Sequence, residues 1–191
     1  MTSTMGQNIF LKMEPAVDAA LGAGYRLFDT AKFYYNEAEL GLALEVHYHE
    51  EKGWWDSAAL AIVTFPCNIY YIDLVLIHFP KTKESEANDP NNAKHRRNTY
   101  KALETNGLIR SIGVSNYEIH HLEEIREFGQ DLPAVIQVEF HPHFTRDELR
   151  NYCIVNKIFF QAYASLARHN EELMEHEIVL NLAKKYSSSV P

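Results

Sequence analysis

The 191-residue sequence predicts an α/β protein, an incomplete TIM-type (β/α)8 barrel with about six of the eight strands, folded as a single domain over residues 1–191. Short apolar runs alternate with stretches of helical spacing, and this alternation predicts a parallel sheet. The apolar residues within each run are nearly continuous, which is typical of strands buried on both faces. Six strand-and-helix pairs favour a barrel, although the pattern also allows an open doubly wound sheet.

The expected strands are rich in β-branched and aromatic residues, and they occupy residues 25–30, 60–65, 71–79, 109–116, 134–142 and 158–165. The expected helices are 14–24, 37–51, 95–107, 119–129, 146–157 and 176–187. Gly24, Gly107 and Gly129 end three of them, where glycine adopts the left-handed conformation at low cost. The polar segment Lys81–Asn98 is predicted as a long loop. It is either a solvated connection or a substrate loop, since it follows the end of a strand.

Composition excludes several classes of function. The sequence has 18 Lys and Arg against 26 Asp and Glu, a net charge of -8, which would repel the backbone of a nucleic acid. The two cysteines, Cys67 and Cys153, have no CxxC spacing, so neither a disulfide framework nor a cysteine zinc site is predicted. The N-terminus lacks the pattern of a signal peptide, and no stretch is apolar enough for a membrane span. We therefore expect a cytoplasmic protein without nucleic-acid or membrane partners.

Polar side chains gather at the carboxyl ends of the expected strands, where barrel enzymes place their chemistry. One such residue alone would more often be a buried polar group with a structural partner. A whole set at one end is harder to explain by structure, because each polar group costs free energy to desolvate unless it is paired. The set comprises Asp29, His78, Ser115, Asn116, Gln137, Glu139 and Tyr163.

Five segments carry a resemblance to a known family. They read "GYRLFDTAKFYYNEAELG", "YIDLVLIHFP", "GLIRSIGVSNYEIHHLEEI", "AVIQVEFHP" and "FFQAYASL" in order, and the match covers most of the chain from Ala16 to Leu166. This series resembles the successive motifs of the aldo-keto reductase family, whose members are (β/α)8 barrels that reduce carbonyl groups with NADPH. The resemblance implies a small aldehyde or ketone as the substrate.

The resemblance also implies roles for individual residues. Carbonyl reduction needs an acid that releases its proton in the transition state, and a tyrosine beside a cation suits this task. By similarity, Tyr34 would be that acid, Asp29 would pair with the lysine that supplies the cation, and His78 would orient the substrate oxygen. Ser115, Asn116 and Gln137 would hold the carboxamide of the cofactor, and Tyr163 would stack on its nicotinamide ring. Tyr35 is expected to be a surface or packing residue.

One departure from the family concerns the lysine. The family pattern ends a strand with Val-Thr-Lys, but here Phe65 follows Thr64. Without the cation, proton donation would be inefficient and Asp29 would lose its partner. Spacing alone supports neither Lys32 nor Lys52 as a substitute, and of the two Lys32 is the one within reach of Tyr34. The link from Phe65 to Tyr71 is also shorter than the dozen or so residues of a parallel crossover. Displacement of strand 60–65, or a different pairing of it, would explain the short link. Loss of one segment would explain both the short link and the missing lysine.

The ends of the sequence depart from the family as well. The family has a strand before the helix at 14–24, and a last strand and helix that bind the 2′-phosphate of the cofactor; we expect neither here. NADPH binding should therefore be weakened. Two open sheet edges would remain, which a protein partner would cover.

His47 with His49 and His141 with His143 suggest a metal only weakly, so no metal site is predicted. Two hypotheses remain: an impaired NADPH-dependent reductase, or a catalytically inactive relative with a binding or regulatory role.

Overall fold

The computed structural model describes residues 3–31, 34–50, 59–61, 72–82 and 84–190, and within these it does not describe the side chains of 3–12, 45–50 and 59–61. Several features discussed above lie outside the described residues. They are Lys32, Lys52, Phe65 and the link from Phe65 to Tyr71. The predicted departures at these positions therefore stay predictions from the sequence.

Six parallel strands form one sheet in the order β1-β2-β3-β4-β5-β6. Five of them fall within segments predicted as strands, and β2 begins at Ala59, one residue before the predicted segment 60–65, so the parallel α/β fold is confirmed. The strands are β1 (Leu27–Asp29), β2 (Ala59–Ala61), β3 (Ile72–Ile77), β4 (Ile109–Ser115), β5 (Val135–Glu139) and β6 (Phe159–Tyr163).

The helices occur between the strands as predicted, with differences at their ends. They are α1 (Ser3–Gly22), α2 (Glu37–Glu50), α3 (Asn91–Glu104), α4 (Ile119–Glu127), α5 (Asp147–Asn156), α6 (Glu171–Met174) and α7 (Glu177–Lys185), with a 3-10 turn η3 (Ala167–His169). Helix α1 begins 11 residues before the predicted start at Glu14. Gly24 and Gly129 have φ values of +90° and +72°, as expected for residues that end helices. None of the helices within the described residues is long and apolar enough to cross a bilayer.

The prediction of a long loop over Lys81–Asn98 was wrong for its second part. Helix α3 begins at Asn91. The Asp89 carboxylate accepts a hydrogen bond from the Asn91 backbone N–H at 2.8 Å, and Pro90 lies between them. An aspartate followed by proline is a typical helix start, because the carboxylate satisfies an amide that has no partner within the helix.

Packing divides the chain into two compact units. We call Met1–Leu76 with Ala102–Ile112 the N-terminal unit, and Ile77–Lys101 with Gly113–Pro191 the C-terminal unit. Each is described by itself, and the prediction of a single domain stays a prediction.

In the N-terminal unit, α1 and α2 pack against each other around Val17, Leu40, Ala43 and Leu44. Phe28 of β1 is partly buried against this cluster. Strand β1 is more exposed than its apolar sequence predicts, with Leu27 44% exposed. An edge strand has a neighbour on one side only, so the prediction that every strand is fully buried was wrong for β1.

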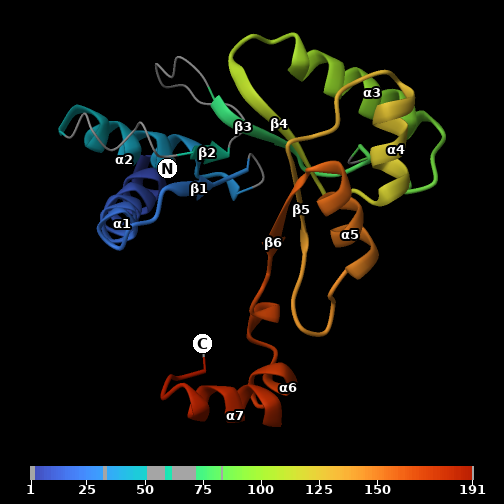
Figure 1. Ribbon diagram of the computed structural model, residues 1–191. Helices are drawn as coiled ribbons and strands as arrows, with labels where there is room; N and C mark the ends of the chain where they lie inside the picture. The colour runs from blue at the N-terminus through green and yellow to red at the C-terminus, as the bar shows by residue number, and fades with distance from the viewer. Residues whose placement is uncertain (1–2, 32–33, 51–58, 62–71, 83, 191) are drawn as a thin grey trace. The chain divides into compact units, whose positions relative to one another are not determined.

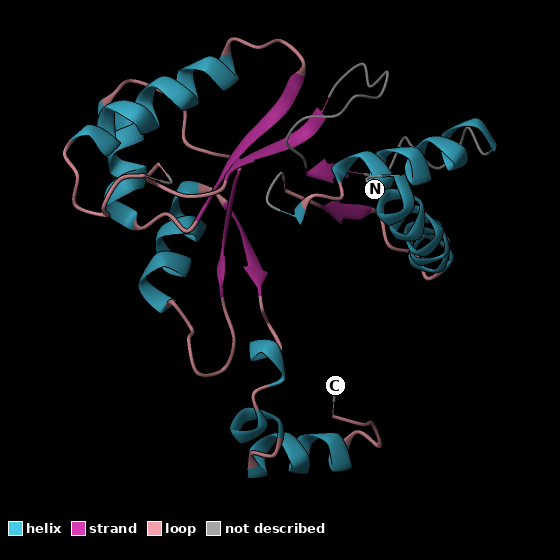
Figure 2. Ribbon diagram, turned by 180° about the vertical axis from the view of Figure 1, so that it is seen from behind, coloured by secondary structure: helices cyan, strands magenta, loops and turns pink. Residues whose placement is uncertain are grey.

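In the C-terminal unit, α3, α4 and α5 lie on one side of β5 and β6 (Figures 1 and 2). The core here contains Val114, Leu122, Ile136 and Val138, which are at most 1% exposed. Beyond the carboxyl end of β6, the chain continues through η3 into α6 and α7. Strand β6 is also more exposed than predicted, with Phe159 67% exposed.

Candidate functional site

The side chain of Asn116 is the centre of a hydrogen-bonded set at the carboxyl ends of the strands. Its Nδ2 donates to the backbone carbonyl of His78 at 2.9 Å and to Ser115 Oγ at 3.1 Å. Its Oδ1 accepts from the hydroxyl of Tyr163 at 2.8 Å. Because a backbone carbonyl can only accept, the group facing His78 must be the amide nitrogen, which fixes the orientation of the Asn116 amide.

The backbone around Asn116 explains why these groups meet. Asn116 directly follows β4 and has a φ of +61°, a left-handed conformation that asparagine tolerates better than most residues. Its N–H donates to the carbonyl of Gln137 at 3.0 Å. Ser115 is the register partner of Gln137 on β5, and Glu139 of β5 is the partner of Tyr163 on β6. The parallel register therefore brings together residues from three consecutive strands.

Ser115 and Tyr163 differ in their exposure. Ser115 is 2% exposed, and its Oγ accepts from the amide of Asn116. Tyr163 and Gln137 are partly exposed. The set thus combines a buried serine with a partly exposed tyrosine and a partly exposed glutamine.

His78 follows the last residue of β3, as the sequence predicts, and it is exposed. Its ring stacks on that of Phe79, with the centroids 4.7 Å apart and the planes 11° from parallel. The structure therefore brings His78, Ser115, Asn116, Gln137 and Tyr163 together in the C-terminal unit.

Asp29 and Tyr34 belong to the N-terminal unit. Asp29 is the exposed last residue of β1, and Tyr34, which is 52% exposed, lies in the turn that follows. The N–H of Tyr34 donates to the carbonyl of Ala31 at 2.8 Å. Because each unit is described by itself, the joining of these two residues with His78 stays a prediction.

Two polar residues hold the ends of the turn that carries Tyr34. The hydroxyl of Thr30, a 6% exposed residue, donates to Oδ1 of Asn36 at 3.0 Å. The Asn36 carbonyl accepts from the N–H of Leu40 in the first turn of α2. Tyr35 is 82% exposed and has a φ of +54°, which agrees with its expected place at the surface.

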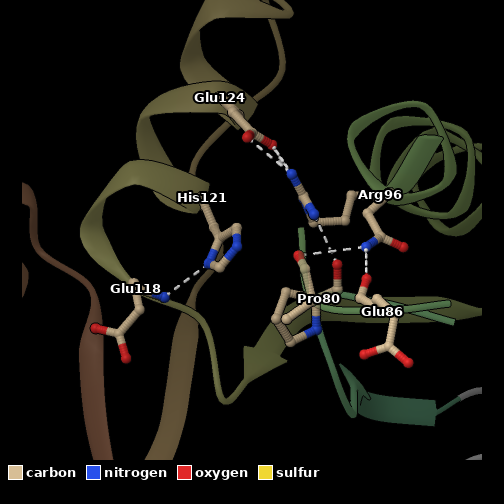
Figure 3. Close-up of polar contacts among 8 residues, drawn as sticks. Pro80, Glu86, Arg96, Glu118, His121 and Glu124 are labelled. Atoms are coloured by element: carbon tan, nitrogen blue, oxygen red, sulfur yellow. Dashed lines mark hydrogen bonds and ion pairs between the residues drawn. The ribbon is translucent and has the colours of Figure 1, made fainter. Parts of the chain in front are cut away.

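A second group of polar residues near the turn of His78 was not predicted from the sequence. Arg96 of α3 forms an ion pair with Glu124 of α4, and it also donates to the carbonyl of Pro80 at 2.7 Å (Figure 3). In the same view, the N–H of Glu118 donates to Nδ1 of His121 at 3.0 Å. Burial, with smaller effects from His120 and Arg96, lowers the pKa of His121 to about 4. Arg96 and Glu124 are 28 positions apart, and no local pattern predicts such a pair.

The histidines named as weak metal candidates do not form a ligand set among the described side chains, in which no group of three or more potential ligands was found. The rings of His141 and His143 are 6.4 Å apart between centroids. His141 Nε2 instead lies 3.5 Å from a carboxylate oxygen of Glu139. His47 and His49 lie in α2, but their side chains are not described.

The chain is similar in sequence to known proteins. The sequence profile described as "Aldo/keto reductase family" matches residues 66–170. Glyoxal reductase of Bacillus subtilis (strain 168) is 33% identical, over 92% of this chain and 65% of the relative. Aldo-keto reductase family 1 member A1 of Mus musculus is 31% identical, over 93% of this chain and 67% of the relative. The chain thus spans about two thirds of the length of these curated relatives.

Solved structures give the same picture of the fold. A crystal structure of MGS-M4, an aldo-keto reductase enzyme from a Medee basin deep-sea metagenome library, matches with a TM-score of 0.74 and 30% identity, over 93% of this chain and 68% of that one. An aldo/keto reductase from Brucella melitensis matches with a TM-score of 0.70 and 29% identity, over 94% of this chain and 71% of that one.

Proposed function

Because the chain belongs to the aldo/keto reductase family, we propose that it acts as an oxidoreductase that reduces small aldehydes or ketones to alcohols with NADPH, at reduced efficiency. The observation that carries this proposal is the hydrogen-bonded set formed by His78, Asn116 and Tyr163 at the ends of three strands. We also propose that the parallel sheet is an incomplete barrel with six of the eight strands.

The residues around Asn116 suit the nicotinamide end of the cofactor. A carboxamide needs both donors and acceptors. The hydroxyl of Ser115 and the amide of Gln137 carry both, and Asn116, whose Nδ2 already donates to His78 and Ser115, would contribute as an acceptor through Oδ1. The partly exposed ring of Tyr163 provides a flat surface for an aromatic ring. NADPH, when bound, supplies the hydride. The residues of this chain hold and orient its ring and keep water from one face of it.

The remaining chemistry is the transfer of a proton to the carbonyl oxygen. We propose that Tyr34 donates this proton from its phenol oxygen and that His78 donates a hydrogen bond that orients the substrate oxygen. Asp29 would be the carboxylate that pairs with an assisting cation; without that cation its negative charge would oppose loss of the Tyr34 proton. General acid catalysis of this kind typically contributes about 10²- to 10⁴-fold to a rate.

The sequence argues for low efficiency. Phe65 stands where the family resemblance expects the lysine that assists the tyrosine. Without that cation, the developing charge on the tyrosine lacks electrostatic stabilisation, which is often the largest single contribution to catalysis. This observation also favours a second candidate function, in which the protein is a catalytically inactive member that binds a protein partner across its open sheet edges.

A cofactor titration followed by a turnover assay separates the two. We expect saturable quenching of NADPH fluorescence by the purified protein, and then slow NADPH oxidation after a reactive aldehyde is added. Tyr34→Phe should abolish the oxidation and leave the quenching unchanged. Tyr35→Phe is the matched control and should change neither. Absence of quenching at millimolar NADPH would contradict the reductase proposal and favour the inactive alternative.

A further inference from the structure

His78 lies in a short turn whose conformation decides where its imidazole is placed. The turn follows β3 directly and contains His78, Phe79 and Pro80. Both rings are exposed, and the ring contact described for His78 is with its own neighbour, Phe79. The position of the imidazole therefore depends on the backbone of this turn more than on core packing.

Two side chains from different elements hold that backbone. Asn116, at the end of β4, donates from Nδ2 to the carbonyl of His78 at 2.9 Å. Arg96, on α3, donates from Nη1 to the carbonyl of Pro80 at 2.7 Å (Figure 3). The turn is thus bonded at its first and third residues by groups that reach it from separate parts of the C-terminal unit.

Arg96 is itself fixed by Glu124. Its Nε lies 2.9 Å from Oε2 and its Nη2 lies 2.7 Å from Oε1 of that carboxylate, which is a two-point contact. Its side chain is only 10% exposed, and that of Glu124 is 27% exposed. The planar guanidinium uses two nitrogens for Glu124 and the third for Pro80. A lysine ammonium could not make this rigid three-nitrogen arrangement.

We infer that Arg96, anchored by Glu124, is a positioning residue that acts together with Asn116 to fix the turn carrying His78. The inference rests on the proposed function, because it gives a purpose to the placement of the His78 imidazole. An ion pair that only joined α3 to α4 would need the contact with Glu124 alone. The additional bond to the carbonyl of Pro80 connects the pair to the turn.

The first test is spectroscopic and needs no catalytic activity. The ring Cε1–H signal of His78 is recorded in protein carrying ¹³C-labelled histidine and assigned by its loss in His78→Gln. We expect one sharp signal in the unmodified protein, and a broadened or divided signal in Arg96→Lys. Arg126→Lys is the matched control, because Arg126 forms an ion pair with Glu123 at 3.1 Å on the same helix as Glu124, with both partners exposed. It should leave the signal unchanged.

Asn116→Gly tests the same turn from the other side and does not disturb the ion pair. Glycine accepts the left-handed conformation of Asn116, so this variant removes the amide without adding backbone strain. It should also broaden or divide the His78 signal. If the signal stays single and sharp in folded Arg96→Lys and Asn116→Gly, the positioning role is wrong.

The second test uses turnover and separates this inference from the proposed function. Arg96→Lys should lower kcat for aldehyde reduction by about tenfold or more, since small misplacements of a catalytic group have effects of that size. The dissociation constant for NADPH should not change. If the unmodified protein shows no turnover, the proposed reaction fails, while the His78 signal still decides the positioning role. A parallel change in kcat and NADPH affinity would indicate a general structural effect and would overturn the inference.

Discussion

The two units differ in how they hold the residues assigned to the site. In the C-terminal unit, the hydroxyl of Tyr163 reaches Asn116, which is 47 positions away, and Asn116 reaches His78, which is 38 positions away. In the N-terminal unit, the turn with Tyr34 is held by Thr30 and Asn36, which are six positions apart. His78, the proposed substrate-orienting residue, thus depends on long-range packing, whereas Tyr34, the proposed proton donor, depends on a local turn.

We therefore expect the residues around Asn116 and the turn that carries Tyr34 to respond differently to mutation. A residue held through the packing of several strands and helices moves only when that packing is disturbed. A residue held by one short turn moves when a single local hydrogen bond is lost.

Truncation of the C-terminal core should have the largest effect. Leu122 of α4 is fully buried, and Leu122→Ala should lower the free energy of unfolding by about 2–5 kcal/mol, because it removes apolar contacts and leaves a cavity. Hydrogen exchange measured by mass spectrometry should show faster exchange throughout peptides from β4, β5 and β6. Peptides covering 25–40 should change less than these.

Leu182→Ala on α7 is the matched control, since Leu182 is 47% exposed and its truncation should change stability by less than about 0.5 kcal/mol. Equal acceleration of exchange in both units by Leu122→Ala would contradict the contrast between them.

The next effect is a loss of stability in acid that depends on His121. Its folded pKa, about 4, is below the value near 6.5 expected in the unfolded chain, so folding favours the neutral ring. Nδ1 of that ring accepts from the N–H of Glu118 at the start of α4, and protonation would remove this acceptor. The contribution of His121 should therefore be complete above pH 6.5 and lost as the pH falls toward 4. Urea unfolding at several pH values measures it.

His121→Gln is the informative comparison, because glutamine at this position can accept the same N–H but does not titrate. The variant should keep the helix start and have a smaller loss of stability between pH 6.5 and 4. An unchanged pH profile would show that other groups cause the acid sensitivity.

In the N-terminal unit, loss of one hydroxyl should affect the turn that carries Tyr34. Thr30→Val keeps the shape of the side chain but removes the hydrogen bond to Asn36, at an expected cost of about 1 kcal/mol. Exchange should become faster in peptides covering 25–40 and stay the same in those from β5 and β6. Thr30→Ser retains the donor and should resemble the unmodified protein. If Thr30→Val leaves exchange in 25–40 unchanged, the bond does not hold the turn.

The sequence was sufficient to predict all six strands and their parallel arrangement, because short apolar runs alternate with stretches of helical spacing. The sequence did not predict the exposure of strand residues, because exposure depends on where a strand lies in the sheet. The exposure of Leu27 and Phe159 follows from the place of β1 and β6 at the sheet edges, which apolar sequence alone does not reveal. Asp89 and Pro90 could have predicted the start of α3, but they lie within a polar segment that was predicted as a loop.

For the site, the sequence located the residues but not their bonds. The places of His78, Asn116 and Tyr163 at strand ends were predictable, since a strand end is a local feature. The orientation of the Asn116 amide depends on two partners from other strands, and no pattern in the sequence encodes it. Arg96 was not identified at all, because an arginine on a polar helix resembles an ordinary solvated residue until its partner, Glu124, is seen.

The smallest effect has the opposite sign and concerns the end of α5. Lys157 ends this helix with a φ of +58°, a conformation that glycine adopts at the ends of α1 and α4. Because the exposed lysine pays a steric cost there, Lys157→Gly should raise the free energy of unfolding by about 0.5–1 kcal/mol.

Thermal unfolding measures the gain, and hydrogen exchange should place it in the C-terminal unit. Asn151→Gly within α5 is the control. It should destabilise the protein slightly, because glycine weakens a helix interior. If Lys157→Gly slowed exchange in peptides covering 25–40 as much as in those from α5, the two units would unfold together. The difference between the long-range packing around Asn116 and the local turn that carries Tyr34 would then hold for their hydrogen bonds but not for their stability.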